Sequence, residues 1–134
     1  MNKDPAALPS LVLAYVGDAV FELYVRLYLL EESSGKVQEL HNHATALVNA
    51  GAQARYYREL EPVMTPRERS VARRGRNVKS RRIPKNADML DYRLSTGFEA
   101  LIGFLFLSDQ KNRMRELIRL SLTNIGGPVE NRQF

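Results

Sequence analysis

Apolar residues recur along most of the chain at spacings of three and four positions, which place side chains on one face of an α-helix. No stretch of useful length alternates apolar and polar residues with a period of two, as a half-buried strand would. The expected fold is therefore all-α. Helices are predicted over about 10–30 (or from 4–5), 36–60, 66–74 and 110–122, and the most apolar segment is 98–107.

The boundaries of one short helix are marked by the residues at its ends. Thr65-Pro66-Arg67-Glu68 has the form of a capping box with proline at the first helical position, so a helix is expected to begin at Pro66. Gly75 is expected to end it. Residues 75–86 contain almost no apolar side chains and are expected to form a loop, after which the chain returns to the core near Met89.

The composition excludes several classes of protein. The chain has 134 residues, 44% of them hydrophobic, which is enough for a single soluble domain over 1–134 with a flexible tail of about 124–134. It has no cysteine, so a disulfide framework and a thiolate zinc site are excluded. Three charges interrupt the apolar run 11–30, so a membrane span is not expected. The N-terminus lacks the layout of a secretion signal, and a cytoplasmic location is expected.

Charged residues form a narrow line on the first predicted helix. Asp18, Glu22 and Arg26 are spaced four residues apart and share one face, while the positions beside them are apolar or aromatic. One interpretation is a solvated stripe with a surface ion pair between Glu22 and Arg26. The narrowness of the line favours a second interpretation, in which the carboxylates belong to a site.

Glu99 is the only charged residue between Phe98 and Leu107. An uncompensated buried carboxylate is very unfavourable, so Glu99 is expected to be capped, paired or bound to a metal. Thr96 and Glu99 fit a capping box, in which Glu99 would bond to the Thr96 amide. A helix that begins earlier, near Asp88, would instead place Glu99 in its interior.

A magnesium site would account for all three acids. Mg²⁺ takes oxygen ligands and keeps several waters, so a cluster of Asp18, Glu22 and Glu99 is suited to it. The spacing alone leaves this site and ordinary capping and pairing open as alternatives.

The positive charge is concentrated in one segment. Residues 65–86, here called the basic segment, contain nine Lys and Arg residues and one acid, for a net charge of +8, whereas the rest of the chain has a net charge of −3. A merely solubilising segment would mix the two signs. Arginine and lysine with few aromatics favour contacts with the phosphates of a nucleic-acid duplex over base stacking.

Several motifs resemble a known family. Tyr15-Val16-Gly17-Asp18-Ala19-Val20 with Glu22-Leu23 resembles the signature helix of ribonuclease III catalytic domains, and Phe98-Glu99-Ala100-Leu101-Ile102-Gly103 resembles their second catalytic helix. The segments 74–80, 84–86 and 92–99 are similar to the Mini-ribonuclease III branch. The resemblance extends from about Leu11 to Leu122.

This resemblance implies a function and assigns roles to residues. It implies a ribonuclease III-like helical bundle that acts as a homodimeric, Mg²⁺-dependent endoribonuclease. Its substrate would be double-stranded RNA at the ends of precursor 23S ribosomal RNA, cut without a separate RNA-binding domain. Asp18 aligns with the catalytic aspartate, Glu99 with the metal-binding glutamate and Tyr15 with an aromatic residue of the dimer interface. The expected RNA-binding residues are Arg73, Arg74, Arg76, Lys79, Arg81, Arg82 and Lys85.

The chain departs from the ribonuclease III pattern at two positions. The family has a glutamate where this chain has Ala14 and an aspartate where it has Thr96, so two of four acids remain. Glu22 is a possible replacement ligand, or it pairs with Arg26. These departures leave an alternative function, a non-catalytic helical RNA-binding or ribosome-assembly module.

Overall fold

The computed structural model of the protein describes residues 3–32, 35–79 and 88–126, and every regular element in these ranges is a helix. The expectation of an all-α fold is confirmed. None of the described helices is long and apolar enough to cross a membrane. The elements are η1 (Pro5–Ala7), α1 (Ser10–Glu32), α2 (Val37–Val48), α3 (Ala50–Leu60), η2 (Glu61–Val63), α4 (Pro66–Arg76), α5 (Met89–Leu107) and α6 (Lys111–Gly126), where η denotes a short 3₁₀ helix.

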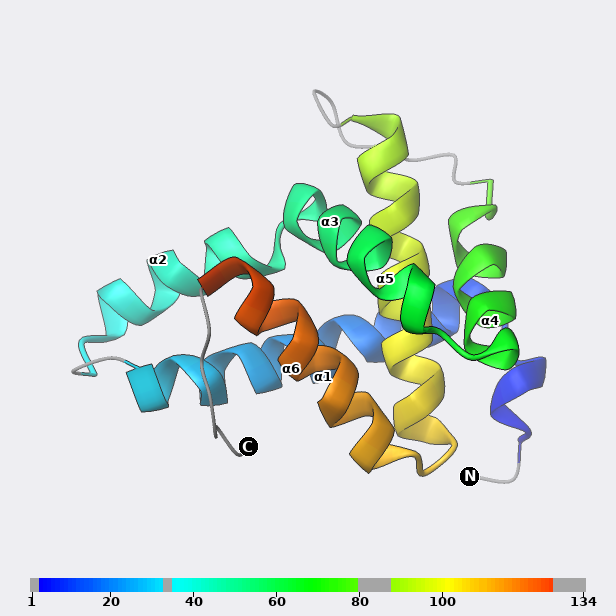
Figure 1. The fold of residues 1–134 in the computed structure, drawn as a ribbon, viewed down its shortest axis with the longest axis horizontal. Coiled ribbons are helices and arrows are strands. Elements are labelled where there is room, and N and C mark those ends of the chain that lie inside the picture. The colour runs from blue at the N-terminus through cyan, green and yellow to red at the C-terminus, as the bar shows by residue number, and fades with distance from the viewer. Residues whose placement is uncertain (1–2, 33–34, 80–87, 127–134) are drawn as a thin grey trace.

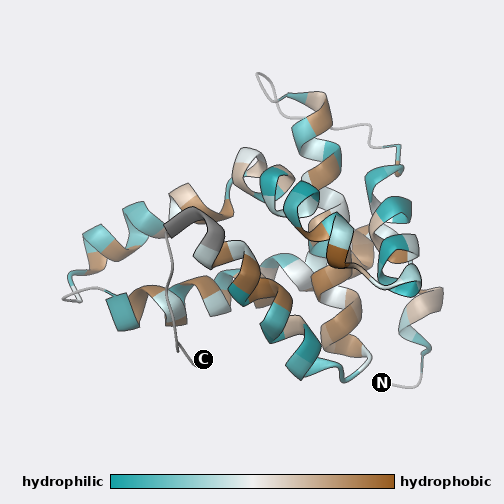
Figure 2. Cartoon of the chain, in the orientation of Figure 1, coloured by the Kyte–Doolittle hydropathy of each residue, from teal (hydrophilic) through white to brown (hydrophobic). Residues whose placement is uncertain are grey.

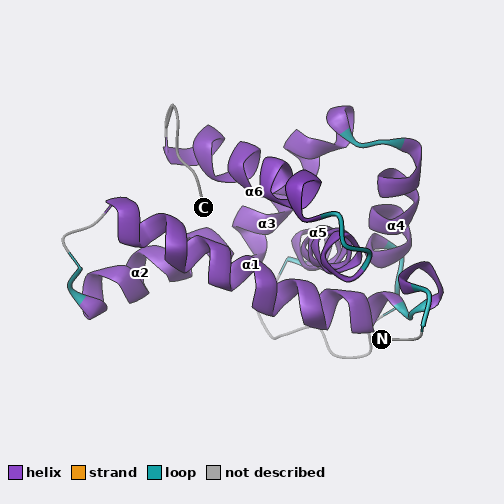
Figure 3. Ribbon diagram, turned by 90° about the horizontal axis from the view of Figure 1, so that it is seen from below, coloured by secondary structure: helices purple, strands orange, loops and turns teal. Residues whose placement is uncertain are grey.

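Helix α5 forms the centre of the fold. It runs through the middle of the molecule in Figure 1, and Figure 3, which views it nearly end-on, shows α1, α3, α4 and α6 around it. Residues 94–105 of α5 are all buried except Glu99, which is half-buried. A helix that is apolar on every side is stable only inside a core, so the sequence of α5 determines its central position.

Three aromatic rings join the central helix to its neighbours. Phe21 of α1, Tyr56 of α3 and Phe98 of α5 pack with ring centroids 4.9 to 5.7 Å apart. All three side chains are fully buried. Edge-to-face pairs of this kind contribute about 0.5–1.5 kcal/mol each beyond their burial, so the cluster fixes α1 and α3 against the part of α5 that carries Glu99.

Two glycines allow the backbones of α1 and α5 to touch. A Cβ atom on Gly17 would lie 1.8 Å from the Glu99 carbonyl oxygen, and one on Gly103 would lie 1.9 Å from the Leu13 carbonyl oxygen. No side chain fits at either position. The crossing therefore holds the backbone beside Asp18 directly against the backbone of Glu99.

The structure corrects two predicted helix boundaries. Residues 36–60 form two helices, because Asn49 has an extended backbone and its side chain caps α3 by accepting a hydrogen bond from the Ala52 amide at 2.8 Å. Gly75 does not end α4, which continues to Arg76. Gly75 instead lies against α5, since a Cβ there would be 3.0 Å from the α-carbon of Gly97.

The last helix extends beyond its predicted end near residue 122, because α6 continues to Gly126. Residues 127–134 lie outside the described part of the chain.

The predicted capping box at the start of α4 is confirmed, and it also anchors α6. The Thr65 hydroxyl accepts from the Glu68 amide at 3.1 Å, and Glu68 accepts from the Thr65 amide at 2.9 Å. Arg113 of α6 donates to both carboxylate oxygens of the buried Glu68, each at 2.9 Å. Burial alone would raise the pKa of Glu68, but the hydrogen bonds from Arg113 and Thr65 outweigh it and lower that pKa. This pairing joins α4, largely hydrophilic in Figure 2, to α6.

Candidate active site

Asp18 and Glu99 come from different helices and meet where α1 crosses α5. Asp18 follows Gly17, whose backbone packs directly against that of Glu99, and the Asp18 side chain is exposed. The Glu99 side chain is half-buried, and the two carboxyl groups are within hydrogen-bonding reach of each other. The structure thus brings together two acids that lie 81 positions apart in the sequence.

The environment of Glu99 opposes its ionisation. Burial, followed by the adjacent Asp18 carboxylate, raises the pKa of Glu99 to about 9, while the nearby Gln53 side chain acts in the opposite direction. Among the described residues, neither Asp18 nor Glu99 has an ion pair with lysine or arginine. Two adjacent carboxylates with no cationic partner hold a shared proton or a cation.

Thr96 and Glu99 do not form the alternative capping box. Helix α5 begins ten residues before Glu99, with Asp88 as its cap, so Glu99 is in the helix interior. The Thr96 hydroxyl donates instead to the Tyr92 carbonyl oxygen at 3.0 Å. The acid in the apolar segment therefore has no local role in ending a helix.

Glu22 is not brought to this pair. It accepts a hydrogen bond from Arg26 at 3.3 Å, the surface pair that its spacing had left open. The described residues contain no group of three or more histidine, aspartate or glutamate side chains that could hold a metal ion. The site consists of two acids.

Sequence reasoning missed Gln53. Its side chain on α3 is 1% exposed, and its Oε1 accepts a hydrogen bond from the Ser95 hydroxyl of α5. The only signal in the sequence is a long polar residue between Ala52 and Ala54, which does not by itself indicate a site.

The arginines of the basic segment have different environments. Arg74 donates to the Ser10 hydroxyl and to the Ala6 and Leu8 carbonyl oxygens at 2.9 to 3.2 Å, so its guanidinium ties the N-terminal residues to α4. Arg76 is half-buried and donates to Asn77.

By contrast, the ion pair that the described residues provide for Arg73 is a 3.9 Å contact with Glu61, and Lys79 is exposed. Arg81, Arg82 and Lys85 lie outside the described residues.

Tyr15 lies on the solvent side of α1 and is 81% exposed. Other apolar side chains of α1 are exposed along the same helix, so it presents an apolar stripe as well as its buried face. This apolar stripe consists of Leu11, Tyr15, Ala19, Leu23, Leu27 and Leu30.

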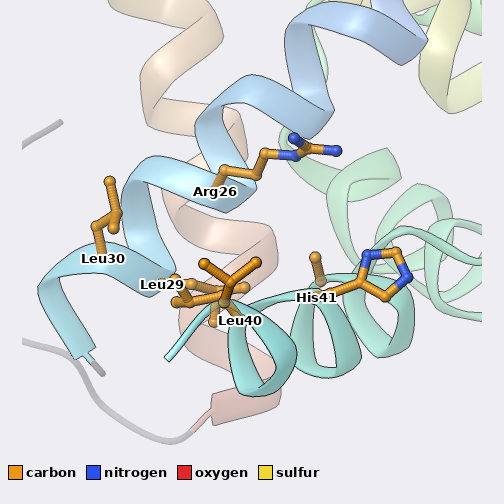
Figure 4. Close-up of a pocket in the computed structure, with 7 residues that line it drawn as sticks. Arg26, Leu29, Leu30, Leu40 and His41 are labelled. Carbon is orange, nitrogen blue, oxygen red and sulfur yellow. The ribbon is translucent and has the colours of Figure 1, made fainter. Parts of the chain in front are cut away.

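A separate cleft of about 280 Å³ lies between the end of α1 and α2. Figure 4 shows Arg26, Leu29 and Leu30 on its α1 side and Leu40 and His41 on its α2 side. Neither Asp18 nor Glu99 lines it, so this cleft is distinct from the acid pair.

Comparison with known proteins identifies the family. The Ribonuclease III domain model matches residues 11–110. The chain belongs to the ribonuclease III family. Proteins called Mini-ribonuclease 3 from Symbiobacterium thermophilum and Enterococcus faecalis are 47% and 43% identical to it. They align with 87% and 92% of this chain and with 89% and 96% of their own lengths.

A crystal structure of a Fusobacterium nucleatum protein has the same fold, with a TM-score of 0.81 and 26% identity over 92% of this chain and 98% of that one. The relatives place the chain in the Mini-ribonuclease III branch, and it is an endoribonuclease. This favours the enzyme over the non-catalytic alternative.

Two positions at which ribonuclease III enzymes were expected to carry acids have other residues in this chain. Ala14, one turn before Asp18, is buried, and Thr96, one turn before Glu99, is buried with its hydroxyl bonded to the backbone. Neither position supplies a carboxylate, so the acids that the described residues place at this crossing are Asp18 and Glu99.

Proposed function

We propose that this endoribonuclease cleaves double-stranded RNA with Mg²⁺ held by Asp18 and Glu99. The observation that carries the proposal is the meeting of two carboxylates, one of them half-buried, with no lysine or arginine paired to either among the described residues. Carboxylate oxygens suit Mg²⁺, which binds through one or two carboxylates and keeps several waters. The donor set therefore fits the ion.

In this proposal the acids bind the metal ion and the cations bind the RNA backbone. A bound divalent cation supplies positive charge at the phosphodiester and lowers the pKa of the attacking water. Asp18 is exposed and therefore accessible to a substrate, while Glu99 is fixed in the core helix by the α1–α5 crossing. Exposed cations of the basic segment hold the RNA backbone, which the acidic remainder of the chain would otherwise repel.

The resemblance to Mini-ribonuclease III points to the duplex at the ends of precursor 23S ribosomal RNA as the substrate and to the cytoplasm as the place of action. Cleavage of such a duplex requires a cut in each strand. A homodimer with two acid pairs provides both cuts.

The first prediction is cleavage that depends on both the metal and the duplex. We expect the purified protein to cut an end-labelled RNA duplex in Mg²⁺, to stop cutting in excess EDTA and to leave the separated strands intact. A transcript carrying the paired ends of precursor 23S ribosomal RNA should be cut within the duplex. Salt-sensitive RNA binding with no cleavage in any divalent ion would contradict the proposal.

The second prediction separates RNA-binding arginines from structural ones. Replacing Arg73 and Lys79 with alanine should weaken duplex binding and reduce the slope of log affinity against log salt by about one unit per lost phosphate contact. The free energy of unfolding should change by less than about 0.5 kcal/mol, since both side chains are at the surface. Fluorescence anisotropy over a salt series measures the slope.

Arg74→Ala is the matched control for that prediction. Because Arg74 bonds to the N-terminal residues, its loss should lower the free energy of unfolding by about 1–2 kcal/mol, with a smaller effect on the salt slope. An unchanged slope in the Arg73 and Lys79 variant would show that this part of the basic segment faces away from RNA.

The third prediction concerns the homodimer, for which the apolar stripe on α1 is the proposed interface. Tyr15 is its most exposed member, and Asp18 lies three residues further along the helix, so the interface would adjoin the acid pair. Tyr15→Arg should weaken dimerisation about 30-fold or more, as loss of a central aromatic typically does. Sedimentation velocity measures the change.

Val37→Arg on α2 is the control for Tyr15→Arg, because Val37 is equally exposed, at 80%, but lies off the stripe. It should leave the dimer intact. A Tyr15→Arg protein that stays dimeric would place the interface elsewhere.

A further inference from the structure

The carboxamide of Gln53 is a buried polar group that is only half satisfied. Its oxygen accepts from the Ser95 hydroxyl, but its nitrogen, Nε2, is buried without a fully formed hydrogen bond among the described residues. Leaving a buried donor without a partner is unfavourable, so a glutamine at this position requires a reason other than packing.

The geometry of α5 directs this nitrogen toward the acid pair. Ser95 and Glu99 are four residues apart, so they lie on the same face of α5, one turn from each other. With its oxygen bonded to Ser95, the Gln53 carboxamide has its nitrogen on the same face of α5, on the side of Glu99. The Gln53 side chain is also close enough to Glu99 to interact with it.

We propose that Gln53 is a positioning residue of the active site: its carboxamide, anchored by Ser95, holds one oxygen of the Glu99 carboxylate and leaves the other toward Asp18. This inference rests on the proposed function, in which Glu99 is a metal ligand. Ligating carboxylates are commonly fixed by hydrogen bonds from neighbouring residues. Here the requirement is greater, because Ala14 and Thr96 supply no further acids to hold the ion.

The orientation of the amide explains why two polar residues are buried together. Ser95 is 7% exposed and its hydroxyl anchors the Gln53 amide, but a hydroxyl can donate or accept, so Ser95 alone does not choose between the two ends of the amide. A reversed amide would place oxygen against carboxylate. The ionised Glu99 carboxylate only accepts hydrogen bonds, so it selects the orientation in which Gln53 donates.

The test is Gln53→Met, which keeps the length of the side chain and removes the amide. Metal binding is measured on the RNA-free protein by titration with Mn²⁺, with the free ion followed by electron paramagnetic resonance. The Mg²⁺ concentration that gives half-maximal cleavage is measured in parallel. We expect Mn²⁺ affinity to fall, and the Mg²⁺ concentration required to rise, by about 10- to 100-fold, as loss of a supporting hydrogen bond typically causes.

Tyr56→Phe is the matched control. It removes another hydrogen bond of α3, from the Tyr56 hydroxyl to the Leu47 carbonyl oxygen of α2 at 2.8 Å, and keeps the aromatic ring in place. It should lower the thermal midpoint without changing Mn²⁺ binding. If Gln53→Met loses stability but binds Mn²⁺ as the wild type does, Gln53 is merely structural and the inference is overturned.

Two further variants keep the outcome decisive. If Gln53→Met does not fold, Ser95→Ala replaces it: a weaker Mn²⁺ affinity supports the inference, and an unchanged one overturns it. Glu99→Gln separates this inference from the proposed function. A Glu99→Gln enzyme that cuts normally overturns both, whereas an inactive one beside a Gln53→Met protein with normal metal binding overturns only the role of Gln53.

Discussion

Glu99→Gln and Asp18→Asn are each expected to reduce cleavage of duplex RNA by on the order of 10³-fold or more while stabilising the metal-free protein. Each replacement keeps the shape of the side chain and removes one of two adjacent carboxylates. Catalysis is lost because the metal loses a ligand. The metal-free fold gains stability because replacing Glu99 removes the cost of burying that carboxyl group, and replacing Asp18 removes the neighbouring acid that opposes its ionisation.

The pH dependence of the free energy of unfolding provides a second, independent test of Glu99→Gln. Because the pKa of Glu99 is raised from 4.5 to about 9 in the folded protein, the folded state binds a proton that the unfolded state has released between these values. Stability of the metal-free wild type should therefore fall as pH rises through this window. Glu99→Gln should lack this part of the fall.

Thermal unfolding with and without Mg²⁺ measures both effects. Mg²⁺ should raise the unfolding midpoint of the wild type and not that of either variant, because a ligand stabilises only the state that binds it. Glu22→Gln is the control, since Glu22 is paired with Arg26, and its cleavage rate should change less than about threefold. Full activity in Asp18→Asn would show that the acid pair is not the catalytic site.

The acids of the site were predictable from the sequence because each is conspicuous where it stands. Glu99 is a single charge in an apolar segment, and burial without compensation is so unfavourable that the position itself implies a partner. That the partner is Asp18 and not Glu22 depends on which turn of α1 lies against α5. This is settled by backbone contact at Gly17, which the helical spacing of the acids does not reveal.

The differences among the arginines of the basic segment were not predictable from charge. Counting Lys and Arg treats every cation as available to bind RNA. Arg74, however, donates hydrogen bonds to three groups of the N-terminal residues, whereas Arg73 has a long, 3.9 Å contact with the Glu61 carboxylate. Those partners are more than 60 residues from Arg74 in the sequence. Only the tertiary fold distinguishes a cation that holds the protein together from one that is free to hold RNA.

The break between α2 and α3 was hidden by the hydrophobic pattern itself. Apolar positions continue at helical spacing across Asn49, so the pattern predicts one helix over 36–60. The side chain of Asn49 caps α3 with a local hydrogen bond and so competes with continuation of α2. The spacing of apolar residues contains no information about such a hydrogen bond. The break has a consequence for the site, because α3 is the helix that carries Gln53.

Gly17→Ala is expected to be the most damaging single methyl group that can be added to the α1–α5 crossing. The new Cβ would lie 1.8 Å from the Glu99 carbonyl oxygen and 2.8 Å from the Gly103 amide nitrogen, and neither backbone atom is able to rotate away. The two helices must separate, so we expect the free energy of unfolding to fall by at least about 3 kcal/mol. Chemical denaturation measures this loss.

The same change should also damage catalysis in the molecules that remain folded. The oxygen that the methyl group displaces belongs to Glu99 itself, so separating the helices moves one acid away from the other. A displacement of about 1 Å in a catalytic group costs on the order of 10²-fold in rate. Activity per folded molecule, at a temperature below the unfolding transition, distinguishes this effect from simple instability.

Gly51→Ala provides the matched control for Gly17→Ala. Gly51 lies in the first turn of α3, where a Cβ would meet only ordinary contacts at 3.4 Å and beyond. There the methyl group should stabilise the protein by about 0.5–1 kcal/mol, since alanine restricts the unfolded chain and favours helix. The opposite signs follow from one geometric fact, that the backbones of α1 and α5 touch at Gly17. A Gly17→Ala protein as stable and active as the wild type would mean that Asp18 and Glu99 are not brought together by this crossing.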